Sequence, residues 1–254
     1  MPSTRKPQVS AKDVLEEWYY NQDPLANDCA KIAESQYRAG YEIRRGLIST
    51  IKSDSQFRSC LDQNKSSRLL IDIRPENPTG SLELPIVALD TYRELESLEG
   101  SHGTGRVIQL VFFASQHKDV TRDRHMDPSD LALSLLSQLV YHYRHFDADD
   151  LRRAKIRIDP RDISSILLEF ERLLIRLPRN TTVIIIIDDL DAFAHPSPRE
   201  RRMMHTIGRL LEIHGDRQYE AKLKFIFGNS SRNIFSYDLF KERDTLRIRS
   251  SSRR

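Results

Sequence analysis

A run of β-branched apolar residues past the middle of the chain constrains the fold more than any other segment. Residues 181–187 read Thr-Thr-Val-Ile-Ile-Ile-Ile and are followed directly by Asp188 and Asp189. β-Branched side chains favour strands over helices, and a run without alternating polar residues is typical of a strand covered on both faces. Such strands belong to parallel sheets, so the run predicts an α/β protein.

The segments around this strand alternate between strand-like and helix-like patterns. Short apolar runs predict further strands at 69–73, 107–114 and 223–227, and an edge strand at 245–249. Helices are expected between them, namely one with Ile86, Leu89, Tyr92 and Leu95 on one face, one capped by Asp127-Pro128, one capped by Asp159-Pro160, one opened by Ser197-Pro198 and a short one over 232–240. This alternation predicts βαβ units, hence a three-layer α/β fold with a parallel sheet between helices.

The predicted organisation has four parts. Residues 1–11 form a disordered polar leader, 12–63 a helical N-terminal arm, 64–250 the α/β domain and 251–254 a basic tail. In the arm, Asp23-Pro24 predicts a helix start, and Ser53-Asp54-Ser55-Gln56 predicts a capping box. The arm also carries Trp18, Tyr19 and Tyr20, which either mark a partner surface or pack onto the following domain.

Composition narrows the classes of partner. The chain has 254 residues, 40 basic and 37 acidic, and its apolar runs are all shorter than a membrane span. No charged-then-apolar signal starts the chain, so we expect a cytoplasmic protein without a membrane partner. Lysine and arginine form no block interleaved with aromatic residues, so nucleic acid is not expected either. Cys29 and Cys60 are expected to be small buried residues without a disulfide.

The acidic residues after the 181–187 strand are the main candidates for chemistry. Open α/β sheets bind ligands outside the carboxyl ends of their strands, where Asp188 and Asp189 would lie. Asp191 adds a third carboxylate, and three charges this close repel unless a cation or an arginine sits among them. The sequence leaves open whether that partner is an ion or an ion pair. A plainer alternative is that the aspartates only end the strand.

A phosphate-binding loop would lie between the first strand and its helix. Residues 74–81 occupy that place and read Arg-Pro-Glu-Asn-Pro-Thr-Gly-Ser, with one glycine and no lysine. A working phosphate-binding loop has the pattern Gly-x-x-x-x-Gly-Lys-Ser/Thr, so this loop is degenerate. Glu76 would repel a phosphate, while Thr79, Gly80 and Ser81 remain the candidate phosphate contacts. The Gly-x-x-x-x-Gly pattern at 100–105 precedes a strand, so a flexible loop is expected there.

Two further strand ends could face the same crevice. Ser115 or Gln116 follows the strand at 107–114, and Ser230 and Arg232 follow the strand at 223–227. Arg232 could sense a terminal phosphate or neutralise the acidic pair. The alternative is a surface arginine behind a helix-capping serine.

Taken in order, these segments resemble the NACHT-type core of the STAND class of P-loop NTPases, especially the large fungal sets. The resemblance covers roughly Ser53 to Arg249. It is carried by the helix at 57–61, the strand at 110–115 with the helix at 131–139, the segment 184–191 and the element 230–232. Asp188-Asp189 resembles a Walker B element, and 74–81 resembles a degenerate Walker A loop.

The resemblance implies a P-loop NTPase-like domain over 64–250 that binds ATP or ADP with Mg²⁺. It implies Asp188 as the metal residue, Asp189 as the catalytic residue that activates water, and Thr79, Gly80, Ser81 and Arg232 as nucleotide contacts. It also implies protein partners and oligomerisation through the core.

Three functions follow from these observations. The degenerate loop favours a nucleotide-binding-fold module with weak or lost hydrolysis, acting as a regulatory or interaction protein. The alternative is an active Mg²⁺-dependent ATPase or GTPase that uses Asp188 and Asp189. A metal-dependent nuclease or phosphoesterase ranks third, because such sites need dispersed acidic and basic partners that are not evident here.

Overall fold

The fold is built on one five-stranded sheet. The computed structural model describes residues 9–20, 22–38, 41–62, 64–74, 82–98, 106–117, 127–193, 197–216, 218–230 and 239–249. The strands are β1 (Ser67–Arg74), β2 (Arg106–Phe112), β3 (Thr181–Ile187), β4 (Lys222–Asn229) and β5 (Thr245–Arg249). They lie in the order β2-β3-β4-β1-β5, and every neighbouring pair is parallel. The prediction of an α/β fold with a parallel sheet is confirmed.

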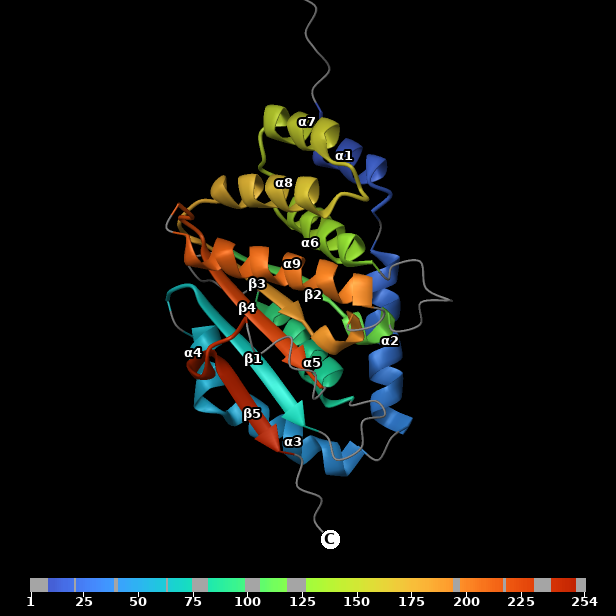
Figure 1. The fold of residues 1–254 in the computed structure, drawn as a ribbon, viewed down its shortest axis with the longest axis vertical. Coiled ribbons are helices and arrows are strands. Elements are labelled where there is room, and N and C mark those ends of the chain that lie inside the picture. Colours follow the sequence, from blue (N-terminus) through green and yellow to red (C-terminus); the bar gives the residue numbers. More distant parts are fainter. Residues whose placement is uncertain are drawn as a thin grey trace, which may run out of the picture.

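The helices of the described part of the chain surround this sheet (Figure 1). They are α1 (Ala11–Glu17), α2 (Asp23–Arg38), α3 (Tyr41–Ser53), α4 (Ser55–Asp62), α5 (Glu83–Leu98), α6 (Pro128–His142), α7 (Ala148–Arg157), α8 (Ile163–Ile175) and α9 (Ser197–Gly215). Short 3₁₀ turns follow β2 (η1, Ala114–His117), follow β3 (η2, Leu190–Phe193) and precede β5 (η4, Glu242–Asp244).

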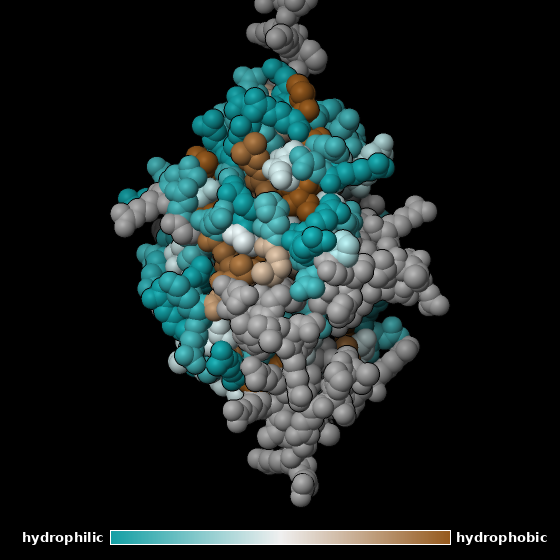
Figure 2. Space-filling view, viewed as in Figure 1, coloured by the Kyte–Doolittle hydropathy of each residue, from teal (hydrophilic) through white to brown (hydrophobic). Residues whose placement is uncertain are grey.

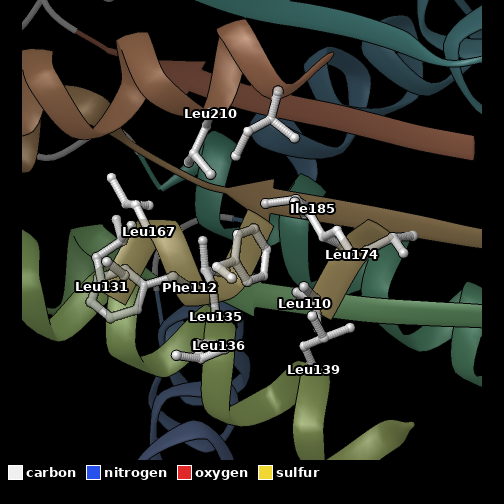
Figure 3. Packing of buried hydrophobic residues seen from close by; sticks show 14 of the residues in the cluster. Leu110, Phe112, Leu131, Leu135, Leu136, Leu139, Leu167, Leu174, Ile185 and Leu210 are labelled. Atoms are coloured by element: carbon white, nitrogen blue, oxygen red, sulfur yellow. The ribbon is translucent and has the colours of Figure 1, made fainter. Parts of the chain in front are cut away.

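Two apolar clusters cover the two faces of the sheet. On one face, side chains of α6, α8 and α9 pack against β2 and β3, as Figure 3 shows for Leu135, Leu174 and Leu210 around Leu110 and Ile185. The opposite face is covered by α5 together with α2, α3 and α4. Because successive strand residues point to opposite faces, the run in β3 contributes to both clusters. The three predicted layers are therefore present.

The outer surface of the described residues differs from this interior. In Figure 2, hydrophilic residues cover most of the described part of the visible face, and hydrophobic ones appear in separate patches. Within the described ranges, none of the helices combines the length and the apolar character needed to cross a membrane. Both described cysteines are free, with Cys60 buried and Cys29 half-buried.

The N-terminal arm is integrated into both helical layers. Helix α1 contacts α6 and α7, α2 and α3 contact α5, and α4 contacts β1. Helix α1 begins at Ala11, inside the segment expected to be a leader, because Ser10 and Asp13 form a capping box there. Trp18 is 5% exposed and packs onto the α/β domain, whereas the Tyr19 side chain is 93% exposed.

Two expected helix starts are wrong by a few residues. Helix α8 is capped by Asp162, whose carboxylate accepts from the N–H groups of Ser164 and Ser165, and not by Asp159-Pro160. Asp159 instead closes the preceding turn by accepting from Arg161 N. Asp162, three residues after Asp159, is the better cap because its carboxylate accepts from two N–H groups of the first helical turn.

Helix α4 shows a similar shift. Ser53 ends α3, and the cap of α4 is Asp54, which accepts from Gln56 N at 2.7 Å. The predicted capping box at Ser53 is therefore replaced by an Asx cap one residue later.

Three other boundaries differ from expectation. Strand β2 ends at Phe112, because Ala114 already begins η1. Helix α7 is not among the expected helices; it begins after Asp147 and buries Leu151 and Ala154. Of the helix expected over 232–240, residues 232–238 lie outside the described ranges, and Leu239 and Phe240 are not helical.

Candidate functional site

Polar side chains from four neighbouring strands meet at the carboxyl edge of the sheet. All strands are parallel, so their carboxyl ends share this edge. Helix α5, the next described element after β1, covers one face, whereas Phe240, which follows β4, lies on the other face with its ring centroid 5.3 Å from that of Phe227. Strands β1 and β4 therefore flank a topological switch point, the place where open α/β sheets bind ligands.

Asp188 is tied to the end of β2. Its side chain is 2% exposed, and its Oδ1 accepts from Ser115 N at 3.1 Å. Ser115 Oγ donates to the other oxygen, Oδ2, and Gln116 Nε2 donates to Ser115 Oγ at 3.1 Å. Ser115 is thus the residue after β2 that reaches the acidic pair, and Gln116 orients it.

Asp189 is tied to the end of β4. It is 1% exposed, and Ser230 donates to both of its oxygens, from N to Oδ1 at 3.3 Å and from Oγ to Oδ2 at 2.9 Å. Asp191 N donates to the same Oδ1 at 3.2 Å, so Asp189 also caps its own 3₁₀ turn. We call Asp188, Asp189, Ser115 and Ser230 the acidic corner.

A second polar pair lies beside the acidic corner. Asp72 on β1 and Asn229 on β4 are partners in the strand register and are both fully buried. Asn229 Nδ2 donates to Asp72 Oδ1 at 3.2 Å, across a separation of 157 residues in the chain. Sequence reasoning did not single out Asp72, although an aspartate inside the apolar run Leu69–Ile73 was a visible signal of a buried polar contact.

Gly228 lets β4 approach the acidic corner closely. A Cβ built on Gly228 would lie 1.9 Å from the carbonyl oxygen of Asp188 and 3.0 Å from Leu84 Cδ2. Because no side chain fits this gap, the position needs glycine for the close approach of two backbones.

The predicted site residues divide into two groups. Asp188 and Asp189 are placed together with Ser115 and Ser230. Thr79, Gly80, Ser81 and Arg232 lie outside the described residues, as does the glycine pattern at 100–105.

The oxygens of the acidic corner are of the type that Mg²⁺ prefers. Carboxylate and hydroxyl oxygens of Asp188 and Ser115 would hold such an ion if it binds here. In the ranges that the structure covers, no group of three or more His, Cys, Asp or Glu side chains is arranged to hold a metal ion.

No protein-family model matches the chain, and no curated protein is significantly similar to it.

Proposed function

We propose that the chain is a nucleotide-binding-fold module of the STAND/NACHT-like kind with weak or lost NTP hydrolysis, acting as a regulatory or interaction protein. The observation that carries the proposal is the hydrogen bonding of the acidic corner. Each carboxylate oxygen of Asp188 and Asp189 accepts from a serine that follows a neighbouring strand. Both aspartates therefore connect strand ends, whatever else they bind.

The fold supports a nucleotide-binding ancestry. A parallel sheet with a switch point at β1 and β4 and an acidic pair after β3 suits a P-loop-like arrangement. The degenerate sequence of 74–81, with no lysine and with Glu76, argues against tight binding of a triphosphate. A nucleotide-binding scaffold with a weak cradle fits a regulatory module better than an efficient hydrolase.

The geometry of Asp189 supports weak hydrolysis in particular. A carboxylate that activates water must direct an oxygen toward the attacking molecule. Ser230 N, Ser230 Oγ and Asp191 N all donate to Asp189, which directs both of its oxygens toward the protein. These hydrogen bonds hold η2 and the end of β4 together. They leave the carboxylate oxygens of Asp189 with fewer lone pairs to accept a proton from a water molecule.

The alternative is an active Mg²⁺-dependent ATPase or GTPase. One observation favours it, because a buried carboxylate paired with a serine hydroxyl at this edge is a ligand set for Mg²⁺. Asp188 would then hold the ion and Asp189 would orient the water.

Phosphate release separates the two functions. Purified protein and an Asp189→Asn variant are incubated with ATP or GTP and Mg²⁺, and phosphate is measured. The amide keeps one oxygen acceptor and the volume of the side chain, so the variant preserves much of the local packing. The proposal predicts the same background rate for both proteins. Turnover by the wild type well above that of a folded Asp189→Asn variant would establish the ATPase or GTPase instead.

A further inference from the structure

We propose that a cavity between the N-terminal arm and α6 binds a small organic cation, separately from the acidic corner. The cavity has a volume of about 210 Å³. Its wall comes from the residues after α1, the start of α2, the end of β2 with η1, and the part of α6 from Asp130 to Gln138. Six of its residues carry the argument, namely Trp18, Tyr20, Asp28, Phe112, His117 and Asp130.

The charge of the wall selects for a cation. Two carboxylates, Asp28 and Asp130, line the cavity, whereas no lysine or arginine is among its described lining residues. Asp28 is 5% exposed, and its Oδ2 lies 3.0 Å from His117 Nε2. Its Oδ1 lies 3.6 Å from Nζ of Lys31, which is mostly exposed. Asp130 accepts from Asp127 N at the start of α6 through Oδ2. An anionic ligand would meet two acidic side chains in this wall and be repelled by them.

The aromatic residues favour the same class of ligand. Trp18, Tyr20 and Phe112 contribute ring surface, and the ring of His117 is packed 5.1 Å from that of Phe112. Aromatic faces attract cations, and the attraction is stronger where water is excluded. Trp18 is 5% exposed, and its indole ring adds π surface to the wall.

The size of the cavity sets the size of the ligand. A dry cavity of about 150 Å³ accommodates benzene, so about 210 Å³ accommodates one ring with a short chain. An arylalkylamine, with one ring and a protonated amine, combines the required size, apolar body and charge.

Tyr19 at the edge of this cavity has an unusual backbone. Its φ is 53°, and it occupies the position after the end of α1 where a left-handed residue, usually glycine, closes a helix. Its side chain is 93% exposed although Tyr19 lines the cavity. A tyrosine kept at a position that favours glycine provides an aromatic ring that can cover a bound ligand.

Calorimetric titration with three probes tests the proposal. Phenethylamine, phenethyl alcohol and phenylacetate share a similar body and differ in charge. We expect saturable binding of the amine, weaker binding of the alcohol and the weakest binding of the carboxylate. Equal affinity for the amine and the alcohol, or no saturable binding of the amine, would overturn the proposal.

Two pairs of variants locate the binding site. Leu133→Phe enlarges a side chain that lines the cavity, and Leu168→Phe makes the same change at an exposed site on α8. Asp130→Asn removes one charge and keeps an acceptor for Asp127 N, with Asp149→Asn on α7 as its control. We expect the two cavity variants to bind phenethylamine at least about tenfold more weakly, while the controls bind normally. Unchanged binding by folded Leu133→Phe would place the ligand elsewhere and refute the cavity.

Discussion

Replacement of Gly228 by alanine tests whether the close approach of β4 to the end of β3 shapes this edge of the sheet. The added Cβ would lie 1.9 Å from the carbonyl oxygen of Asp188 and 2.8 Å from its carbonyl carbon. The two backbones would have to separate by about 1 Å before the contact became tolerable. Leu84, at 3.0 Å, crowds the same point, so the methyl group cannot move aside freely.

The expected loss of stability is large for a single methyl group. Inserted methyl and methylene groups in well-packed cores cost about 1–3 kcal/mol. Since Gly228→Ala meets backbone atoms, which adjust less than a flexible side chain, we expect the free energy of unfolding to fall by about 3 kcal/mol or more. Urea denaturation followed by circular dichroism measures this change, provided that the m-value stays constant.

Two helical glycines supply a matched control. At Gly46 on α3 and Gly208 on α9, an added Cβ would meet no atom of the described residues within 4 Å, apart from its chain neighbours and its own helix backbone. Alanine at either position should raise the free energy of unfolding by about 0.5–1 kcal/mol, because alanine is the better helix former. The same substitution therefore has opposite signs at the strand and at the helices. A Gly228→Ala protein that loses less than about 1 kcal/mol would refute the close approach as a structural requirement.

Individual contacts allow three other predictions. In a double-mutant cycle, Asp188→Asn and Ser115→Ala should show a coupling energy of about 1–3 kcal/mol in urea unfolding, because the hydroxyl donates to a buried carboxylate; additive effects would contradict this. Burial, followed by the charge of Arg68, lowers the pKa of His214 below its ordinary 6.5. As the pH falls, the unfolded chain therefore takes up the proton before the folded protein does, so the free energy of unfolding should decrease from about pH 6.5 downward. His214→Phe should make the denaturation midpoint depend less steeply on pH. An unchanged pH dependence would contradict the role of His214. Tyr19→Gly should stabilise the protein by up to about 1 kcal/mol by relieving the left-handed backbone, whereas Tyr19→Ala should not; thermal unfolding compares the two, and equal effects would exclude backbone strain.

The strands were the most predictable part of the fold. The β3 run was recovered residue for residue, because five consecutive β-branched apolar residues leave little choice but a strand covered on both faces. The remaining strands were found within about two residues. Strands β1, β2 and β4 contain short apolar runs, and β5 alternates apolar and charged residues. Helix starts were less certain wherever two capping residues compete, as Asp159 and Asp162 do before α8.

The candidate site was predictable only in part. Asp188 and Ser115 could be placed at one edge because parallel strands share that edge. The contact between Asp72 and Asn229 depends on β1 lying beside β4, which residue patterns along the chain do not specify. The need for glycine at position 228 could not be predicted either. It results from the Asp188 backbone at the end of the neighbouring strand, and the sequence does not show which strands are neighbours.

Titration with fluorescent ATP and ADP, with and without Mg²⁺, tests the central claim most directly. The wild type is compared with Asp188→Ala, and circular dichroism checks that the variant is folded. The proposed function predicts weak or undetectable binding that Mg²⁺ does not tighten and that Asp188→Ala leaves unchanged. Tight binding of MgATP by the wild type that disappears in a folded Asp188→Ala protein would contradict it and would identify Asp188 as a metal ligand.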